Sequence, residues 1–222
     1  MSQRRGAHSY LRIPLMLLAV GDLFLLGSQL RPWSAALLVP GNENPAFDLA
    51  LILPAYAWIA WWITGNHRSR YNLALAEGTY LGPLSGLLLV AQIALQGQTG
   101  DGQLGVVSYG LWAGAGVLWA IAGGRGARAA KHGGMGLFAG MWSALTGCLM
   151  ASTFSLARMV PAIANIGLGE SLRQSDALGS SGPTTAQILL SMVPVEGVLL
   201  LGVMAGAVLG LVSGMLAAPK QD

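Results

Sequence analysis

Six apolar stretches, each long enough to cross a lipid bilayer, constrain this chain more than any other feature of its sequence. The hydrocarbon core of a bilayer is about 30 Å thick, and roughly 20 helical residues cross it. Backbone groups must be hydrogen-bonded within lipid, and because the stretches are continuous rather than alternating, they predict helices and not barrel strands. The predicted spans are residues 13–30, 47–64, 79–96, 104–123, 134–157 and 188–217.

The composition places the chain outside the soluble class. Only 9% of the residues are charged and 54% are hydrophobic, whereas about a quarter of the residues in soluble domains are charged. The net charge of +3 comes from short basic clusters between apolar stretches, a pattern that does not favour nucleic-acid binding. The single cysteine, Cys148, excludes an internal disulfide and a thiolate metal cluster. We therefore expect an all-α polytopic integral membrane bundle, with one transmembrane domain over residues 1–222.

The loops predict an orientation. By the positive-inside rule, Lys and Arg gather on the cytoplasmic side, so both termini are expected there. Arginines precede the first apolar stretch as in a signal peptide, but no clear cleavage site follows, so we expect a retained span. The short loops suggest a bacterial inner membrane. One side carries Arg4, Arg5, Arg12, Arg68, Arg70, Arg125, Arg128, Lys131 and Lys220, and the other carries Arg31, Arg158 and Arg173.

The longest connection, residues 158–187, is predicted to be an external loop. Its flexible part includes residues 179–183, and residues 161–172 could form a short interfacial helix. This loop either acts as a lid or partner-docking segment or is an ordinary connection.

Glycines at four-residue intervals predict close helix packing. Glycine lets two backbones approach within lipid, where dispersion contacts replace the hydrophobic effect. The ridges could pack inside the bundle or mediate association with a second copy or with other membrane subunits. Three spans followed by three also suggest inverted repeats, although residue-level similarity between the halves is lacking. The glycines are Gly78, Gly82 and Gly86 in the third stretch, and Gly202, Gly206, Gly210 and Gly214 in the sixth.

Asp22, in the middle of the first stretch, is the sharpest functional candidate. An ionised carboxylate there costs at least about 2.5–3.5 kcal/mol unless it is paired, hydrated or protonated. Gln29 shares its helix face, and both should point into the bundle. The residue either handles a proton or cation, or is a hydrogen-bonded structural aspartate. The candidate transport path consists of Asp22 and Gln29 with the span-five hydroxyls Ser143, Thr146 and Thr153.

Two glutamates are interpreted as interfacial. Glu196 follows Pro194 in a stretch that exceeds the bilayer core, so we expect it in a first helical turn at the interface. A deeper Glu196 would have Arg158 as its partner. Glu77 is expected to face Arg68 or Arg70 at the cytoplasmic surface.

The sequence carries no recognisable reaction chemistry. The histidines His8, His67 and His132 have no metal-binding spacing, and the serines lack a triad pattern. We expect no catalytic residue, metal or cofactor, and a lipid bilayer as the surrounding partner. The favoured function is transport of a small solute or ion through an intramembrane carboxylate. The alternative is a non-catalytic subunit of a larger membrane complex, and a membrane enzyme acting on lipid or isoprenoid substrates is less favoured.

Overall fold

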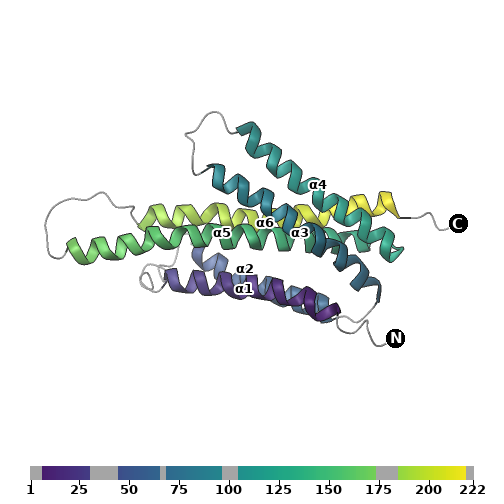
Figure 1. Cartoon of the computed structure of the whole chain (residues 1–222), viewed down its shortest axis with the longest axis horizontal. Helices are drawn as coiled ribbons and strands as arrows, with labels where there is room; N and C mark the ends of the chain where they lie inside the picture. The colour runs from purple at the N-terminus through teal and green to yellow at the C-terminus, as the bar shows by residue number, and fades with distance from the viewer. Residues whose placement is uncertain (1–6, 31–44, 66–68, 97–104, 174–184, 219–222) are drawn as a thin grey trace.

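The described residues form helices, joined by a turn between the fourth and the fifth. The computed structural model describes the chain except for residues 1–6, 31–44, 66–68, 97–104, 174–184 and 219–222. The helices are α1 (Ala7–Leu30), α2 (Pro45–Gly65), α3 (Ser69–Gln96), α4 (Gly105–Ala130), α5 (Met135–Arg173) and α6 (Thr185–Ala217) (Figure 1). The all-helical prediction is confirmed for this part of the chain.

Four of the helices are long and apolar enough to cross a membrane. In α1 and α2 the described apolar segments, Leu15–Ser28 and Asp48–Trp62, are shorter. The predicted count of six spans and the side of the termini therefore stay predictions. The four membrane-length segments are Tyr71–Leu95, Val106–Ala130, Met135–Met159 and Val195–Ala217.

Two helices extend well beyond their predicted limits. Helix α3 begins at Ser69, before the predicted start at residue 79, and α5 continues to Arg173, past the predicted end at residue 157. Much of the predicted external loop is therefore a continuation of α5. The difference arises because hydropathy gives the limits of the most apolar part of a stretch, whereas backbone hydrogen bonding continues wherever the local sequence permits.

Helix α5 lies at the centre of the bundle, in contact with α1, α3, α4 and α6. Of its membrane-length segment 67% is buried, whereas no other such segment exceeds 33%. Its buried positions include the small residues Ala139, Ser143, Ala144, Cys148 and Ala151. Small side chains allow neighbouring backbones to approach on several sides of one helix.

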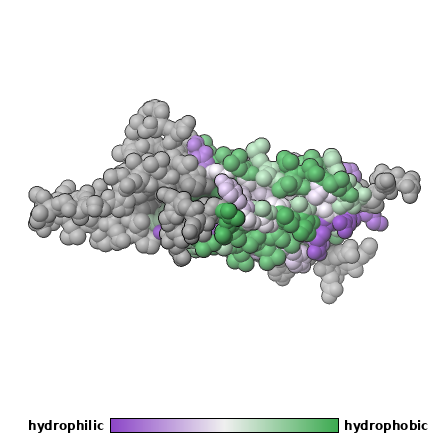
Figure 2. Space-filling model, turned by 90° about the horizontal axis from the view of Figure 1, so that it is seen from above, coloured by the Kyte–Doolittle hydropathy of each residue, from purple (hydrophilic) through white to green (hydrophobic). Residues whose placement is uncertain are grey.

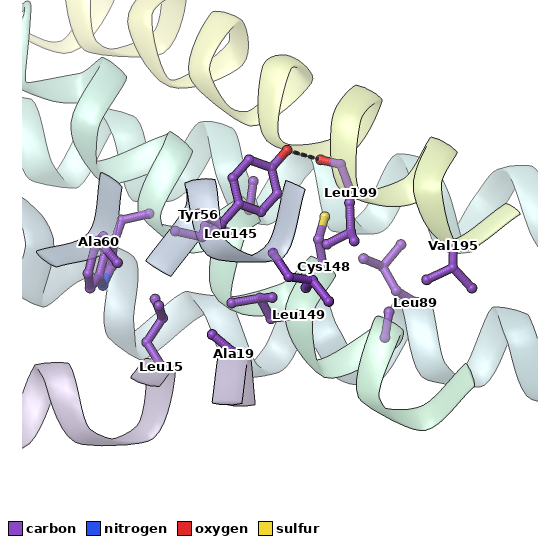
Figure 3. Packing of buried hydrophobic residues seen from close by; sticks show 14 of the residues in the cluster. Leu15, Ala19, Tyr56, Ala60, Leu89, Leu145, Cys148, Leu149, Val195 and Leu199 are labelled. Atoms are coloured by element: carbon purple, nitrogen blue, oxygen red, sulfur yellow. Dashed lines mark hydrogen bonds between the residues drawn. The ribbon is translucent and has the colours of Figure 1, made fainter. Parts of the chain in front are cut away.

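Larger side chains fill the core where α1 and α2 join α5 and α6 (Figure 3). Leu15 of α1 and Leu149 of α5 belong to this cluster and are almost fully buried. The hydroxyl of Tyr56 on α2 donates a hydrogen bond of 2.8 Å to the carbonyl oxygen of Leu199 on α6. Polar and apolar contacts together thus fix α2 to the rest of the bundle.

The outer surface is also apolar over the middle of the molecule (Figure 2). Exposed large apolar side chains occur on α1, α2, α3, α4 and α6, as at Phe24, Leu51, Leu87, Val117 and Leu201, and on none of the described residues of α5. An apolar surface of this extent is unfavourable in water and suits contact with lipid.

Helices α5 and α6 run in opposite directions. Gly136 of α5 lies against Gly214 of α6, and Gly140, farther along α5, lies against Gly206, so these two helices are antiparallel. The turn between α4 and α5 adjoins the end of α6 through Gly133 and Ala218. The first turn of α1 and the last turn of α6 lie at the same end of the bundle (Figure 1).

Candidate functional site

The carboxylate of Asp22 is fully buried where α1 packs against α5. The Ser152 hydroxyl donates a hydrogen bond of 2.5 Å to Oδ2, and Thr153 Oγ1 lies 2.5 Å from Oδ1. Thr153 Oγ1 also lies 2.9 Å from the carbonyl oxygen of Leu149, one turn earlier in α5. Within the described part of the chain, two hydroxyl groups are the hydrogen-bonding partners of the carboxylate.

The structure brings together only some of the residues of the predicted path. Asp22 and Thr153 meet, whereas Ser143 and Thr146 lie where α5 faces α3. The side chain of Gln29 lies outside the described residues. Ser152 was missed because it lies beside the helical stripe that Ser143, Thr146 and Thr153 share. A carboxylate has two oxygens, so it can span two adjacent positions of a facing helix.

Polar side chains also join α3 to α5. Trp142 Nε1 donates a hydrogen bond of 2.9 Å to Thr79 Oγ1, and that hydroxyl donates to the Leu75 carbonyl at 2.8 Å. Thr146 donates to the Trp142 carbonyl within its own helix at 2.9 Å. The hydroxyls of Thr79 and Thr146 therefore contribute to helix structure and packing.

The glycines of α3 face α5. A methyl group added at Gly78 would lie 2.5 Å from the carbonyl oxygen of Ala139, and one added at Gly82 would lie 2.7 Å from Thr146 Cβ. At Gly86, the nearest neighbour is the Met150 sulfur, at 2.9 Å. The contacting positions advance together along both helices, so α3 and α5 are parallel and closely packed.

The glycines of α6 lie against another side of α5. A methyl group at Gly210 would lie 2.5 Å from the Gly136 carbonyl oxygen and 2.8 Å from Gly140 Cα. One at Gly214 would lie 2.6 Å from the Gly133 carbonyl oxygen, and one at Gly202 would lie 2.5 Å from the sulfur of Cys148. One at Gly206 would overlap the Ala144 methyl group. The interface between α5 and α6 thus brings backbone directly against backbone.

Glu196 is half-buried on α6, next to the first residue of the membrane-length segment. The expectation that it lies in a first helical turn is wrong, because α6 begins at Thr185. Arg158, proposed from the sequence as its partner at depth, donates a hydrogen bond of 3.2 Å to the carbonyl oxygen of Ile93 near the end of α3. Its guanidinium carbon also lies 5.8 Å from the centre of the Phe154 ring. The described contacts of Arg158 therefore join the end of α3 to α5.

The basic end of the bundle contains an ion pair between helices. Glu77 of α3 pairs with Arg125 of α4 at 2.7 Å, whereas the sequence favoured Arg68 or Arg70, whose side chains lie outside the described residues. Arg125 lies within reach because α3 and α4 form an antiparallel pair, which brings the end of α4 beside the start of α3. Arg128 and Lys131 are exposed nearby.

Histidine at this end has a structural contact. The backbone N–H of Gly134 donates a hydrogen bond of 3.2 Å to His132 Nδ1, which shapes the turn between α4 and α5. The side chains of His8 and His67 lie outside the described residues. Among the described side chains, no group of three His, Cys, Asp or Glu residues could hold a metal ion.

Comparison with known proteins found no relative of this chain. No protein-family model, curated protein or solved structure matches the chain.

Proposed function

We propose that the chain is an integral membrane protein of six spans, with both termini cytoplasmic, in a bacterial inner membrane. Four membrane-length helices and two shorter apolar ones support the span count. The shared end of the first turn of α1 and the last turn of α6 supports the common side of the termini. The exposed Arg128 and Lys131 at the turn between α4 and α5 favour the cytoplasm for that end.

Within this bundle, Asp22 handles a small solute or ion during transport. The observation that carries the proposal is a fully buried carboxylate whose described partners are two uncharged hydroxyls. An ionisable group in such a place costs stability, at least about 2.5–3.5 kcal/mol when charged, so it is rare without a function. Its contact with α5, the helix that most of the others touch, couples the site to the whole bundle.

The test is ion or solute flux in liposomes. We expect Asp22→Asn to abolish the flux, or its dependence on pH, while the bundle stays folded. Asp48→Asn is the matched control, because Asp48 lies in the first turn of α2 and is only half-buried. A flux that survives Asp22→Asn unchanged would contradict the proposal.

A second candidate is a non-catalytic subunit of a larger membrane complex. The glycines of α3 and α6 already pack inside the chain, but Gly110 on α4 is exposed, with no atom within 4 Å of an added methyl group, and Val106 and Tyr109 beside it are exposed as well. An open face of this kind suits a neighbouring helix. If this candidate is right, native mass spectrometry of the protein purified in mild detergent will show another polypeptide in fixed ratio. The Gly110→Leu variant should lose that polypeptide.

A further inference from the structure

Three hydrogen-bond contacts surround Asp22, and they use three hydrogens if each contact has its own. They are the Ser152 Oγ contact with Oδ2, the Thr153 Oγ1 contact with Oδ1, and the Thr153 Oγ1 contact with the Leu149 carbonyl oxygen. Oxygens 2.5–2.9 Å apart are at hydrogen-bond distance and need one hydrogen between them. Each hydroxyl has a single hydrogen to donate, and a carbonyl oxygen has none. Serine and threonine therefore provide two hydrogens for three contacts.

Only one arrangement gives each of the three contacts a hydrogen of its own, so that the Thr153 hydrogen is not shared between two acceptors. The Leu149 carbonyl can only accept, so Thr153 must donate to it. The contact between Thr153 Oγ1 and Asp22 Oδ1 then needs a hydrogen from the carboxyl group. Because a carboxylic acid carries one hydrogen, its other oxygen, Oδ2, must accept from Ser152. This arrangement matches a neutral carboxylic acid, which has one donor oxygen and one acceptor oxygen.

We infer that the Asp22 site binds a proton, held on Oδ1 and donated to Thr153 Oγ1. In the ionised form of the site, the Thr153 hydroxyl hydrogen points to Oδ1 instead of the Leu149 carbonyl. The ionised carboxylate then still accepts two hydrogen bonds, one from each hydroxyl. Each carboxyl oxygen therefore keeps a hydrogen bond to a hydroxyl of α5 in both forms.

No described charge replaces the proton. Helices α2, α3 and α5 contact α1, yet within the described residues the hydrogen bonds of Asp22 go to Ser152 and Thr153 alone. Tyr56 bonds to Leu199, Arg158 to Ile93 and Glu77 to Arg125. The titratable or charged groups on these helices with described side chains are Asp48, Tyr56, Tyr71, Glu77, Tyr80, Cys148 and Arg158.

The experiment is infrared spectroscopy of the full-length protein in nanodiscs at neutral pH, with the aspartate carboxyl carbons labelled with ¹³C. A protonated carboxyl group gives a carbonyl stretching band that an ionised one lacks. We expect a band that is lost in Asp22→Asn and shifted in Thr153→Val, which removes the acceptor of the acid hydrogen. Thr153→Ser should restore the band position.

Thr146→Val is the matched control, because Thr146 makes the same bond to the carbonyl one turn earlier but does not contact Asp22. It should leave the band unshifted. The inference is overturned if Asp22 has no protonated band at neutral pH, or if the band does not respond to Thr153→Val. Thr153→Val and Thr153→Ser provide the answer even if Asp22→Asn fails to fold.

Only the role of this proton in transport rests on the proposed function, and the two fail separately. If Asp22 is protonated but the flux is unchanged in Asp22→Asn, the proton site is confirmed and the transport role is wrong. If the flux requires Asp22 but the carboxylate is ionised at neutral pH, the transport role is supported and the proton site is wrong.

Discussion

Ser152 and Thr153 are adjacent, so their side chains leave α5 in directions about 100° apart, yet both reach the same carboxylate. Asp22 makes this possible because its two oxygens form hydrogen bonds in two directions. The pair therefore locates α1 on α5 both along the helix and around it. A single hydroxyl would fix the distance and leave the rotation of α1 to apolar packing.

At the residue scale, Ser152→Ala should therefore destabilise the protein by about 1 kcal/mol, because Asp22 Oδ2 loses its described donor within the buried site. Ser155→Ala is the control, since Ser155 is a buried serine of the same helix that does not contact Asp22. Thermal unfolding in detergent measures both variants. Equal loss in the two would mean that the bond to Asp22 adds nothing to stability.

Part of this site could be predicted from residue types alone. Asp22 stands out because an acidic residue within an apolar stretch needs a partner, and Thr153 was among the candidate hydroxyls. The role of Ser152 depends on how far α5 is rotated toward α1, and the positions of Ser143 and Thr146 depend on the side from which α3 approaches. Periodicity gives the residues that share a face, but the neighbour of that face is set by tertiary packing.

At the scale of helices, α5 and α6 are in contact through their backbones, so the interface should tolerate no added side-chain atom. Gly210→Ala would bring a methyl group to 2.5 Å from the Gly136 carbonyl and 2.8 Å from Gly140 Cα. Both neighbours are backbone atoms, so the helices must separate, and we expect a loss of about 1–3 kcal/mol.

The matched control is Gly110→Ala, where an added methyl group would have no atom within 4 Å. It should be neutral or slightly stabilising, because alanine favours helix over glycine. Thermal unfolding followed by tryptophan fluorescence compares the two. Similar midpoints for both variants would show that α5 and α6 can separate at no cost.

Helix identity was easier to predict than helix extent or pairing. Continuous apolar stretches predict helices because lipid permits little else, and the described helices cover all six stretches. A short helix over residues 161–172 was predicted, but its continuity with α5 was not, because Arg158 and Pro161 stand where the two helical segments join. The glycine positions predicted close packing, but α5 as the shared partner of α3 and α6 follows from the complementary small residues Gly136, Gly140 and Gly147.

At the scale of the whole molecule, the number of spans depends on α2. This helix has 21 residues, which at about 1.5 Å per residue matches a hydrocarbon core of about 30 Å. Its described apolar segment is nevertheless shorter than those of the four membrane-length helices. A spanning α2 has its ends on opposite sides of the membrane, whereas an interfacial one has both on the same side.

Labelling of single cysteines in cells with a membrane-impermeant maleimide separates these arrangements. For a spanning α2 we expect Asp48→Cys to react from outside and Trp62→Cys only after permeabilisation. Val106→Cys and Lys131→Cys are the controls, because both positions are exposed near opposite ends of α4. Val106→Cys should react from outside, and Lys131→Cys only after permeabilisation. The native Cys148 is fully buried and should give little background. If both α2 positions react from one side while the α4 pair divides, α2 lies along the membrane surface and the six-span arrangement is wrong.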